Sequence, residues 1–381
     1  MSKTVLVVDD ILINRKLIKE CLSKAIEGID FLEAKDGKEA LEVINKNSVS
    51  VIILDIMMPI MDGIEALSKI KEDPFSANIP VIMWSALDEE DSVQKALELG
   101  AVDYFTKPLT SDAIRITLPL KVKNAINYYN TWLELEKYKE KIKEELQLAE
   151  QLQKALVFDY KSYDKVEVWA RYVPCEEVGG DIFCTKQVND KFWFIIADIC
   201  GHGISSAMMS MMLTVIFNAK VEYCKTPGEL LNIINNMFFE VFGEDKLSLI
   251  SAFAGFIIED KLWYSNAGHP YPVIYNNSKK HIKLLEEDGF LIGMLKDVVF
   301  ESKNMEFGKG NHIFLYTDGL FSNMKEANIS GWTSVLKYCN EYDLIFDKDK
   351  SKFLDYLVKH FNYKERTELD DDIAVMIIKN K

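Results

Sequence analysis

The sequence is short of three things: paired cysteines, long apolar runs and basic charge. Its six cysteines are scattered without a Cys-x-x-Cys pair, which argues against a zinc site and is typical of reduced thiols in a cytoplasmic protein. No run of eighteen or more apolar residues occurs, and the N-terminus leads straight into a strand-like segment, so we expect neither a membrane span nor a secretory signal. The net charge of −15 argues against binding to nucleic acid.

A length of 381 residues is enough for two or three domains, each with its own core. In the first 120 residues, short apolar runs alternate with amphipathic stretches, which predicts an α/β fold with a doubly wound parallel sheet. The expected buried strands and the first helix are Thr4–Val8, Val51–Leu54 and Pro80–Trp84, with the helix at Ile13–Ser23.

Polar side chains follow the expected strands at their carboxyl ends, where a doubly wound sheet forms its ligand crevice. Asp9, Asp10 and Asp55 could together hold one Mg²⁺ ion, and Asp55 could accept a phosphoryl group as the nucleophile. Lys107 and Ser85 offer a charge and a hydroxyl group to the oxygens of that phosphoryl group. Any one of these residues alone could be a helix cap or a turn residue, but five at successive strand ends predict a phosphoryl-accepting site.

This segment closely resembles the receiver domain of two-component response regulators, a flavodoxin-like fold. The matching pieces are Val-Val-Asp-Asp, Leu-Asp-Ile-Met-Met-Pro-Ile-Met-Asp-Gly, Trp-Ser-Ala and Tyr-Phe-Thr-Lys-Pro, within residues 3–122. The resemblance implies phosphorylation of Asp55 by a sensor histidine kinase or a phosphotransfer protein. It also implies Mg²⁺ at Asp10, Asp55 and the Met57 carbonyl, with Ser85 and Tyr104 as switch residues.

Residues 126–156 contain neither glycine nor proline and are expected to form one long helix. Apolar residues recur along it at spacings of three and four, with Glu145 interrupting one core position. Such a stripe is typical of a two-stranded coiled coil, and a rigid spacer is the alternative. We expect Pro119 to end the last helix of the receiver and to kink the junction with the linker.

Four aspartates in the C-terminal half each stand where an apolar run meets a short glycine-rich or acidic segment. They are Asp181, Asp198, Asp318 and Asp371. A carboxylate at the mouth of a buried strand is costly unless positive charge meets it, so four such residues suggest one shared cluster of cations. Hard oxygen ligands of this kind suit Mg²⁺ or Mn²⁺.

Strand-like segments dominate the C-terminal 220 residues, and helical stretches lie between them. This order predicts antiparallel sheets with helices outside, an α+β layered architecture. The expected strands are Val166–Tyr172, Phe192–Ala197, Ile250–Ile258, Leu262–Ser265, Pro272–Tyr275, His312–Tyr316 and Ile373–Ile378. The expected helices are Ser205–Cys224, Pro227–Phe242, Thr333–Glu341 and Ser351–Phe361.

The region resembles PP2C-like serine/threonine phosphatases, a β-sandwich flanked by helices, in particular the branch of bacterial stress and sporulation regulators (SpoIIE/RsbU-type). The motifs occur in the order typical of that family. They are Glu-Glu-Val-Gly-Gly-Asp at 176–181, Ala-Asp-Ile-Cys-Gly-His-Gly-Ile-Ser-Ser-Ala at 197–207, Ser-Asn-Ala-Gly-His-Pro-Tyr-Pro at 265–272, Leu-Tyr-Thr-Asp-Gly-Leu at 315–320 and Asp-Asp-Ile-Ala-Val at 371–375.

The resemblance implies a centre of two Mn²⁺ or Mg²⁺ ions. Asp198 would bridge the ions, and the Ile199 carbonyl would join one of them. Asp181 would ligate one ion, directly or through water, and Asp318 and Asp371 would complete the other. A water activated between two cations would then attack phosphorus in line, so that no protein nucleophile is needed.

Other polar residues near these motifs have open roles. His202 and His269 are candidate acids for the leaving group, with packing or a loop hydrogen bond as the alternative. Gly201 and Gly203 allow a tight turn, and Cys184 and Cys200 are expected to fill space. No cysteine is followed by the Cys-x5-Arg cradle of cysteine-dependent phosphatases, which excludes that class.

Three positions depart from the family pattern, and none of them is one of the four aspartates. Cys184 stands where an acid is frequent, Ala374 where threonine is usual, and Ser322 where glutamate is common. These departures bear on metal affinity and on the geometry of the site.

The complete prediction is a cytoplasmic response regulator with a receiver at 1–122, a helical linker at 123–158 and a phosphatase domain at 159–381. Its phosphorylation at Asp55 would control a metal-dependent protein serine/threonine phosphatase and a homodimer formed through the linker. The resemblance implies that the substrate is a phosphorylated anti-sigma-factor antagonist. The alternative is a binding adaptor whose phosphatase-like domain is inactive. Nothing after residue 122 reads as a helix-turn-helix, so a transcription factor is not supported.

Overall fold

The computed structural model describes residues 3–86, 90–107, 113–243, 249–279, 281–322, 350–362 and 369–381. The chain forms two compact units, Met1–Ile142 and Lys143–Lys381, and the division falls within one long helix. The domain boundaries expected at residues 122 and 158 remain predictions.

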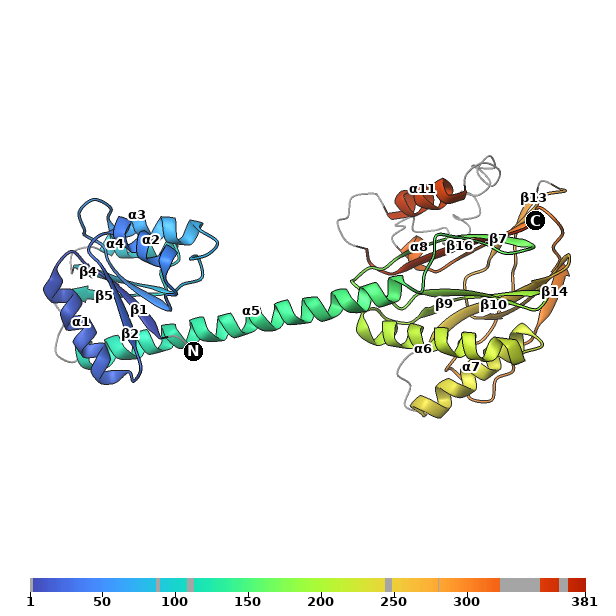
Figure 1. Ribbon diagram of the computed structural model, residues 1–381, viewed down its shortest axis with the longest axis horizontal. Coiled ribbons are helices and arrows are strands. Elements are labelled where there is room, and N and C mark those ends of the chain that lie inside the picture. Colours follow the sequence, from blue (N-terminus) through green and yellow to red (C-terminus); the bar gives the residue numbers. More distant parts are fainter. Residues whose placement is uncertain are drawn as a thin grey trace. The chain divides into compact units, whose positions relative to one another are not determined.

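The N-terminal unit is a parallel sheet with helices on both faces, which confirms the predicted doubly wound fold (Figure 1). The strand order is β2-β1-β3-β4-β5, and each neighbouring pair is parallel. The strands are β1 (Thr4–Val8), β2 (Asp30–Ala34), β3 (Val51–Asp55), β4 (Val81–Ala86) and β5 (Asp103–Lys107). The helices are α1 (Leu12–Ala25), α2 (Gly37–Lys46), α3 (Gly63–Glu72) and α4 (Glu90–Glu98), and a π-helical turn, η1 (Ala113–Thr117), precedes α5 (Leu118–Lys154).

Two apolar cores cover the two faces of this sheet. On one face, α1 and the start of α5 pack against β1, β3 and β4 through buried residues such as Ile18, Leu22 and Val122. On the other face, α2, α3 and α4 contribute residues such as Leu67 and Ala96. Because both faces are covered, the central strands are apolar throughout rather than alternating.

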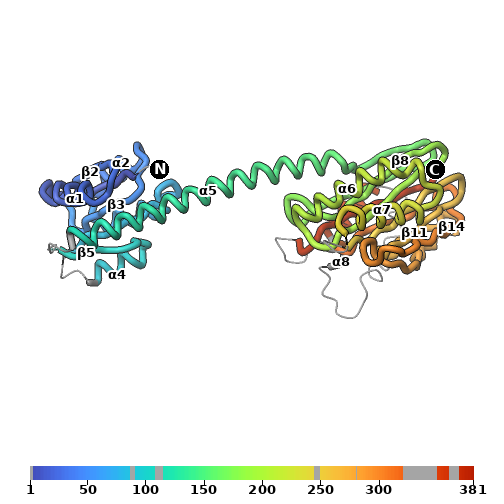
Figure 2. The backbone as a smooth tube through the Cα atoms, turned by 90° about the horizontal axis from the view of Figure 1, so that it is seen from below, coloured from blue at the N-terminus to red at the C-terminus, as the bar shows by residue number. Residues whose placement is uncertain are grey.

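The helix α5 corrects one prediction from the sequence. Pro119 does not end the last helix of the receiver, since α5 begins at Leu118 and continues without interruption to Lys154 (Figure 2). Proline is tolerated in the first turn of a helix, because the N–H groups there have no partner within the helix. The last receiver helix and the expected linker helix are therefore one element of 37 residues.

The C-terminal unit contains two antiparallel sheets packed face to face, which confirms the predicted sandwich. One sheet has the strand order β14-β11-β10-β9-β8, and the other has the order β13-β12-β15-β16-β7-β6. The strands are β6 (Tyr160–Ser162), β7 (Val166–Val173), β8 (Ile182–Val188), β9 (Lys191–Ile199), β10 (Ile250–Ile258), β11 (Lys261–Ala267), β12 (Val273–Asn276), β13 (His281–Leu284), β14 (Lys303–Glu306), β15 (His312–Tyr316) and β16 (Ile373–Asn380).

Helices lie outside both sheets and produce a layered unit (Figure 1). A core between the sheets joins residues such as Phe194 and Phe253 of one sheet to Leu315 and Met376 of the other. A second core lies under α6 and α7, and a third lies under α8 and α11. These helices are α6 (Ile204–Lys220), α7 (Pro227–Phe242), α8 (Gly319–Ser322) and α11 (Lys350–Asn362), and the 3₁₀ turn η2 (Val221–Tyr223) follows α6.

One segment of this unit, Ile204–Tyr223, is long and apolar enough to cross a membrane by length and composition alone. Its fully buried residues include Leu213, Phe217 and Val221, which belong to the core that lies under α6 and α7. Its apolar character is therefore explained by packing in the sandwich.

The sequence missed four strands of this unit: β6, β8, β13 and β14. Three of them have only three or four residues, and β8 carries polar residues in its second half, so their apolar signal is weak. The predicted helix at Thr333–Glu341 lies outside the described residues.

The stacked phenylalanines between the sheets give a test of the sandwich core. Phe194 is fully buried, and its ring centroid lies 6.4 Å from that of Phe253. We expect Phe194→Ala to reduce the free energy of unfolding of this unit by about 3–5 kcal/mol in chemical denaturation, because the cavity stays partly open. Phe290→Ala is the matched control, since Phe290 is 53% exposed and its truncation should cost little. Equal losses for the two variants would contradict the assignment of the core.

Candidate metal centres

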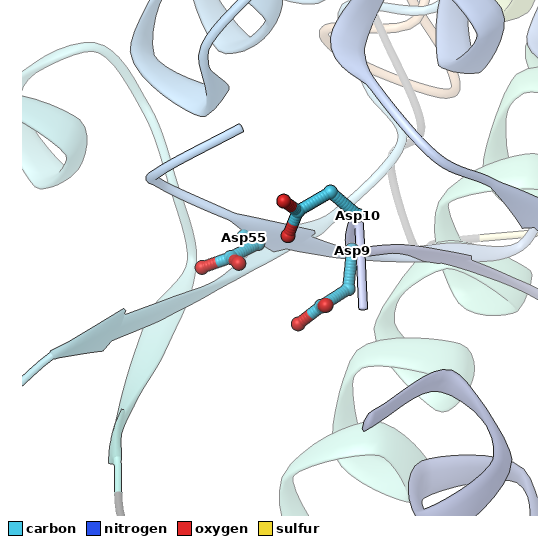
Figure 3. A group of neighbouring side chains, drawn as sticks. All are labelled: Asp9, Asp10 and Asp55. Carbon is cyan, nitrogen blue, oxygen red and sulfur yellow. The ribbon is translucent and has the colours of Figure 1, made fainter. Parts of the chain in front are cut away.

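The first candidate centre lies at the carboxyl ends of β1 and β3 in the N-terminal unit. Figure 3 shows the carboxylates of Asp9, Asp10 and Asp55 turned toward a common point. One ligand oxygen from each lies within 4.8 Å of the others, a spacing that suits a single hard cation. The structure thus brings together the three acids that the sequence predicted to share Mg²⁺. Met57, whose carbonyl the resemblance implied, follows Asp55 by two residues and is 68% exposed.

Lys107 joins this cluster from the end of β5. Its Nζ lies 2.7 Å from Asp55 Oδ2 and 3.4 Å from Asp9 Oδ2, so one cation faces two carboxylates. Ser85 is fully buried on β4, next to β5 in the sheet, while Tyr104 on β5 is 40% exposed. The five residues that the sequence placed at strand ends therefore come from neighbouring parallel strands, whereas Tyr104 stands on the surface.

The pKa of Asp55 reflects the unfavourable burial of its negative charge close to Asp9. Burial raises the pKa of Asp55 to about 6, and the charge of Asp9 adds to the rise, while Lys107 opposes both effects. Asp9 is held by neutral donors as well: Asn14 Nδ2 donates to both of its oxygens, at 3.1 and 2.9 Å. One lysine does not balance three acids, and a divalent cation fits the remaining charge.

The second candidate centre is in the C-terminal unit, where four strand ends carry the four aspartates predicted from the sequence. Asp181 directly precedes β8, and Asp198 lies one residue before the end of β9. Asp318 stands between β15 and α8, and Asp371 lies two residues before β16. Residues that are up to 190 positions apart in the sequence, as Asp181 and Asp371 are, thus reach one edge of the sandwich.

The pKa values show that these carboxylates act on one another. Burial raises the pKa of Asp198 to about 7, with further contributions from Asp318 and Asp371. Burial also raises the pKa of Asp181 well above its usual value, and Asp198 is the next cause. The pKa of Asp371 is raised by burial and then by Asp318. Carboxylates that lie close together in a partly buried site repel one another unless positive charge is present. Their oxygens are ligands that suit divalent cations such as Mg²⁺ and Mn²⁺, so these residues fit a metal centre.

Two residues that the sequence interpretation did not select hold this centre in place. Thr317 Oγ1 donates to Asp181 Oδ2 at 2.6 Å. Asp372 is buried and accepts from two backbone N–H groups, those of Cys175 at 2.8 Å and Gly180 at 2.6 Å. Asp372 lies in a run of three aspartates, and the sequence offers no signal for which of the three points inward.

The glycines before Asp181 are needed for close packing. A Cβ atom on Gly179 would lie 2.3 Å from Asp372 Oδ2. A Cβ atom on Gly180 would lie 2.9 Å from the Ile199 carbonyl oxygen, which the resemblance names as a ligand. The loop that carries Asp181 can therefore approach both Asp372 and the end of β9 only without side chains at these positions.

A cleft of about 470 Å³ opens beside Asp198 and Asp318. His269 lines it, but the ring is buried, and its Nδ1 lies 2.9 Å from Ser251 Oγ. Burial lowers the pKa of His269 to about 3, so the ring is neutral near pH 7 and is suited to fixing a loop rather than to donating a proton.

His202 is placed differently, since 59% of its side chain is exposed. Its Nδ1 lies 2.8 Å from Glu176 Oε1, which orients the ring and leaves the other nitrogen available. Gly201 and Gly203 flank it with φ angles of +97° and +84°, which confirms the tight turn expected before α6. Of the two histidines, only His202 has an exposed ring, and its role as a proton donor remains a prediction.

Two of the three positions that depart from the family pattern, Cys184 and Ala374, are buried. Cys184 lies on β8, where burial raises the pKa of its thiol to about 12. Cys200, which was also expected to fill space, is instead exposed directly after β9. Ala374 is fully buried on β16. The side chain of Ser322 lies outside the described residues.

Two family models match the chain. The model of the stage II sporulation protein E (SpoIIE) family covers residues 189–381, and the model of the response regulator receiver domain covers residues 5–118. The chain therefore belongs to the SpoIIE family and carries a receiver domain, as the two resemblances predicted.

Curated relatives match one part of the chain each. The chain is 28% identical to the phosphoserine phosphatase RsbP of Bacillus subtilis over 190 residues, which is 49% of this chain and 47% of that protein. It thus spans about half the length of RsbP. It is 40% identical to the chemotaxis protein CheY of Halobacterium salinarum over 114 residues, 30% of this chain and 92% of that protein.

Among solved structures, the C-terminal part is similar in fold to the SiaA-PP2C domain of Pseudomonas aeruginosa. The TM-score is 0.54 at 15% identity, with coverage of 64% of this chain and 99% of the other. The RsbU and RsbW domains of Rv1364c from Mycobacterium tuberculosis give a TM-score of 0.50 at 18% identity, with coverage of 57% and 60%.

The raised pKa of Asp198 predicts how pH acts on the metal-free C-terminal unit. The carboxyl ionises near pH 3.8 in the unfolded chain but at about 7 in the folded unit. The penalty for burying its charge therefore grows between these values and is complete above about pH 7. We expect a higher unfolding temperature at pH 6 than at pH 8 in the presence of a chelator, by calorimetry.

The acidic balance of the whole chain could produce the same trend, so Asp198→Asn is the control. An amide does not ionise, and the variant should unfold at a higher temperature than the wild type at pH 8 without metal, with a smaller gain on acidification. An unchanged pH dependence in the variant would contradict this account of Asp198.

Proposed function

We propose that this protein is a response regulator in which phosphorylation of Asp55 controls a metal-dependent protein serine/threonine phosphatase. The observation that carries the proposal is the placement of Asp181, Asp198, Asp318 and Asp371 at strand ends of one sandwich, with an open cleft beside Asp198 and Asp318. Burial and neighbouring carboxylates raise the pKa values of Asp181, Asp198 and Asp371. Membership of the SpoIIE family and the similarity to a phosphoserine phosphatase support it.

In this proposal the phosphatase centre holds two Mn²⁺ or Mg²⁺ ions. Asp198 would be the ligand shared by both ions, the Ile199 carbonyl and Asp181 would each contribute to one ion, and Asp318 and Asp371 would complete the other. The cations would supply an activated water and neutralise charge on the phosphoryl oxygens. The chain's own part is to fix the carboxylates, through Thr317 and Asp372, and to admit the phosphorylated side chain into the cleft.

The receiver part of the proposal assigns a different role to aspartate. Asp55 would attack the phosphorus of a phosphohistidine on a sensor kinase or phosphotransfer protein, so that the O–P bond forms as the P–N bond breaks and the histidine leaves. The carboxylates and the Met57 carbonyl would hold one Mg²⁺ that neutralises charge on the phosphoryl oxygens. Lys107, now paired with Asp55 at 2.7 Å, would move to an oxygen of the added phosphoryl group. Ser85 would donate its hydroxyl to that group, and Tyr104 would read the change at the surface.

The helix α5 is proposed to carry the regulation through dimer formation. Its apolar stripe is largely exposed in the single chain, its large side chains being between 41% and 67% exposed. The exposed members are Leu135, Tyr138, Ile142, Leu152 and, two residues beyond the end of α5, Leu156, while Ala149 of the same stripe is half-buried. An exposed apolar stripe on a 37-residue helix is unfavourable in water and favours a second copy as its partner.

The proposed substrate is a small phosphorylated anti-sigma-factor antagonist in the cytoplasm. The support is limited to the family and to RsbP, the similar protein named a phosphoserine phosphatase. Recognition would depend on local features around the cleft, because a net charge of −15 repels a phosphoprotein at long range.

Phosphate release tests the catalytic proposal. We expect the wild type to release phosphate from a phosphoserine protein only with Mn²⁺ or Mg²⁺, and Asp198→Asn to lower the rate by about 100-fold or more, since the shared ligand is lost. Asp260→Asn is the control, because Asp260 is a turn acid after β10 and lies outside the cleft. Equal rates for wild type and Asp198→Asn would overturn the assignment. Absence of divalent cation binding at the phosphatase centre in calorimetry, with the receiver site as the remaining binder, would favour the adaptor instead.

The regulatory proposal is tested at Asp55. Treatment with a small phosphodonor such as acetyl phosphate should change both the phosphatase rate and the sedimentation of the wild type, and Asp55→Ala should respond in neither. A double change in the stripe, Leu135→Lys with Ile142→Lys, should abolish the dimer, whereas Gln147→Lys outside the stripe should not. An Asp55→Ala variant that responds like the wild type would contradict the proposal.

A further inference from the structure

Gln153, in the last turn of α5, is a buried amide at the end of a mostly exposed helix. Only 7% of it is exposed, whereas Gln151 and Lys154 beside it face solvent. A buried glutamine is costly unless its polar atoms are paired, and here both are. Its Nε2 donates to the Gly179 carbonyl at 2.7 Å and to Ser210 Oγ at 3.4 Å, and its Oε1 accepts from Gly179 N–H at 3.1 Å and from the Tyr172 hydroxyl at 3.3 Å.

The contact with Gly179 is bidentate, because one amide meets both the N–H and the C=O of the same residue. Gly179 belongs to the segment between the end of β7 at Val173 and the start of β8 at Ile182. No strand ladder fixes the backbone in that segment. The side chain of Gln153 supplies the hydrogen bonds to Gly179 that a neighbouring strand would otherwise make. The carboxylate of Asp372 likewise accepts a hydrogen bond from Gly180 N–H.

This segment carries Asp181, two residues after Gly179. The chain that follows α5 also holds the other side of Asp181, where Phe158 packs edge-on against Phe183 at a centroid distance of 5.3 Å. The end of α5 and its continuation thus contact the residues on both sides of this aspartate. A shift of Gly179 would be passed to Asp181 through a single intervening residue, Gly180.

We propose that Gln153 is a positioning residue that sets the place of Asp181 and thereby the affinity of the carboxylate centre for divalent cations. The inference rests on the proposed function of that centre. It makes the last turn of α5 part of the metal site, although no side chain of α5 is among the proposed ligands. Partners outside the ligand shell have this effect in metal sites generally.

The test compares Gln153→Met with Gln151→Met in the full-length protein. Methionine keeps the length and bulk of glutamine but removes its hydrogen bonds, and Gln151 is the exposed control on the same turn. Calorimetric titration with Mn²⁺ should show, for the phosphatase centre, a dissociation constant about 10–100-fold higher in Gln153→Met and no change in Gln151→Met, while binding at the receiver site stays the same in both. At saturating Mn²⁺, phosphate release by Gln153→Met should return to within a few-fold of the wild-type rate.

A purely structural role predicts a different result. Gln153→Met would then unfold at a lower temperature but bind Mn²⁺ as the wild type does, and that outcome would overturn the inference. If Gln153→Met does not fold, Gln153→Asn replaces it: the amide is kept but is one methylene too short to bridge both groups of Gly179, and the same loss of Mn²⁺ affinity is expected. A wild type that neither binds Mn²⁺ nor releases phosphate would instead refute the proposed function.

Discussion

The repulsion between buried carboxylates is the constraint on which both candidate centres depend. Each unit brings acids to the ends of strands, where burial and neighbouring charge raise the pKa of Asp55 to about 6 and that of Asp198 to about 7. The two units differ in how the negative charge of these carboxylates is compensated. The receiver places Lys107 Nζ 2.7 Å from Asp55 Oδ2, while in the phosphatase-like unit the neutral hydroxyl of Thr317 donates to Asp181, and the proposed cations would balance the remaining charge.

This difference separates two uses of the same side chain. In the proposed function, Asp55 of the receiver is the nucleophile, and Lys107 and one cation would hold the phosphoryl group. The acids of the second unit are proposed to act only as metal ligands, and Asp181 is buried. Gly179 and Gly180 have no side chains, so the backbone before Asp181 can pack closely against Asp372 and the Ile199 carbonyl.

Much of this arrangement could be predicted from the sequence, because its signals are local. Strands such as Val51–Asp55 are continuous apolar runs, and the acids stand at their ends, so that topology alone brings them together. The predictions that were wrong or missing also have physical reasons. Pro119 reads as a helix breaker but is harmless in a first turn, and short or polar strands such as β13 and β8 carry little periodicity. Asp372, Thr317 and Gln153 act through contacts with residues far away in sequence, or through one orientation out of several, and composition does not encode that.

The Gly179–Asp181 segment has one more consequence, which concerns how the centre and the fold each respond to substitution. Side chains from three distant places in the chain hold this segment, and no strand neighbour does. The sandwich cores lie elsewhere, so a substitution at one support leaves most of the folding energy untouched. In the proposed function, a substitution at one of these supports would therefore change the affinity of the centre for cations more than it changes the stability of the fold.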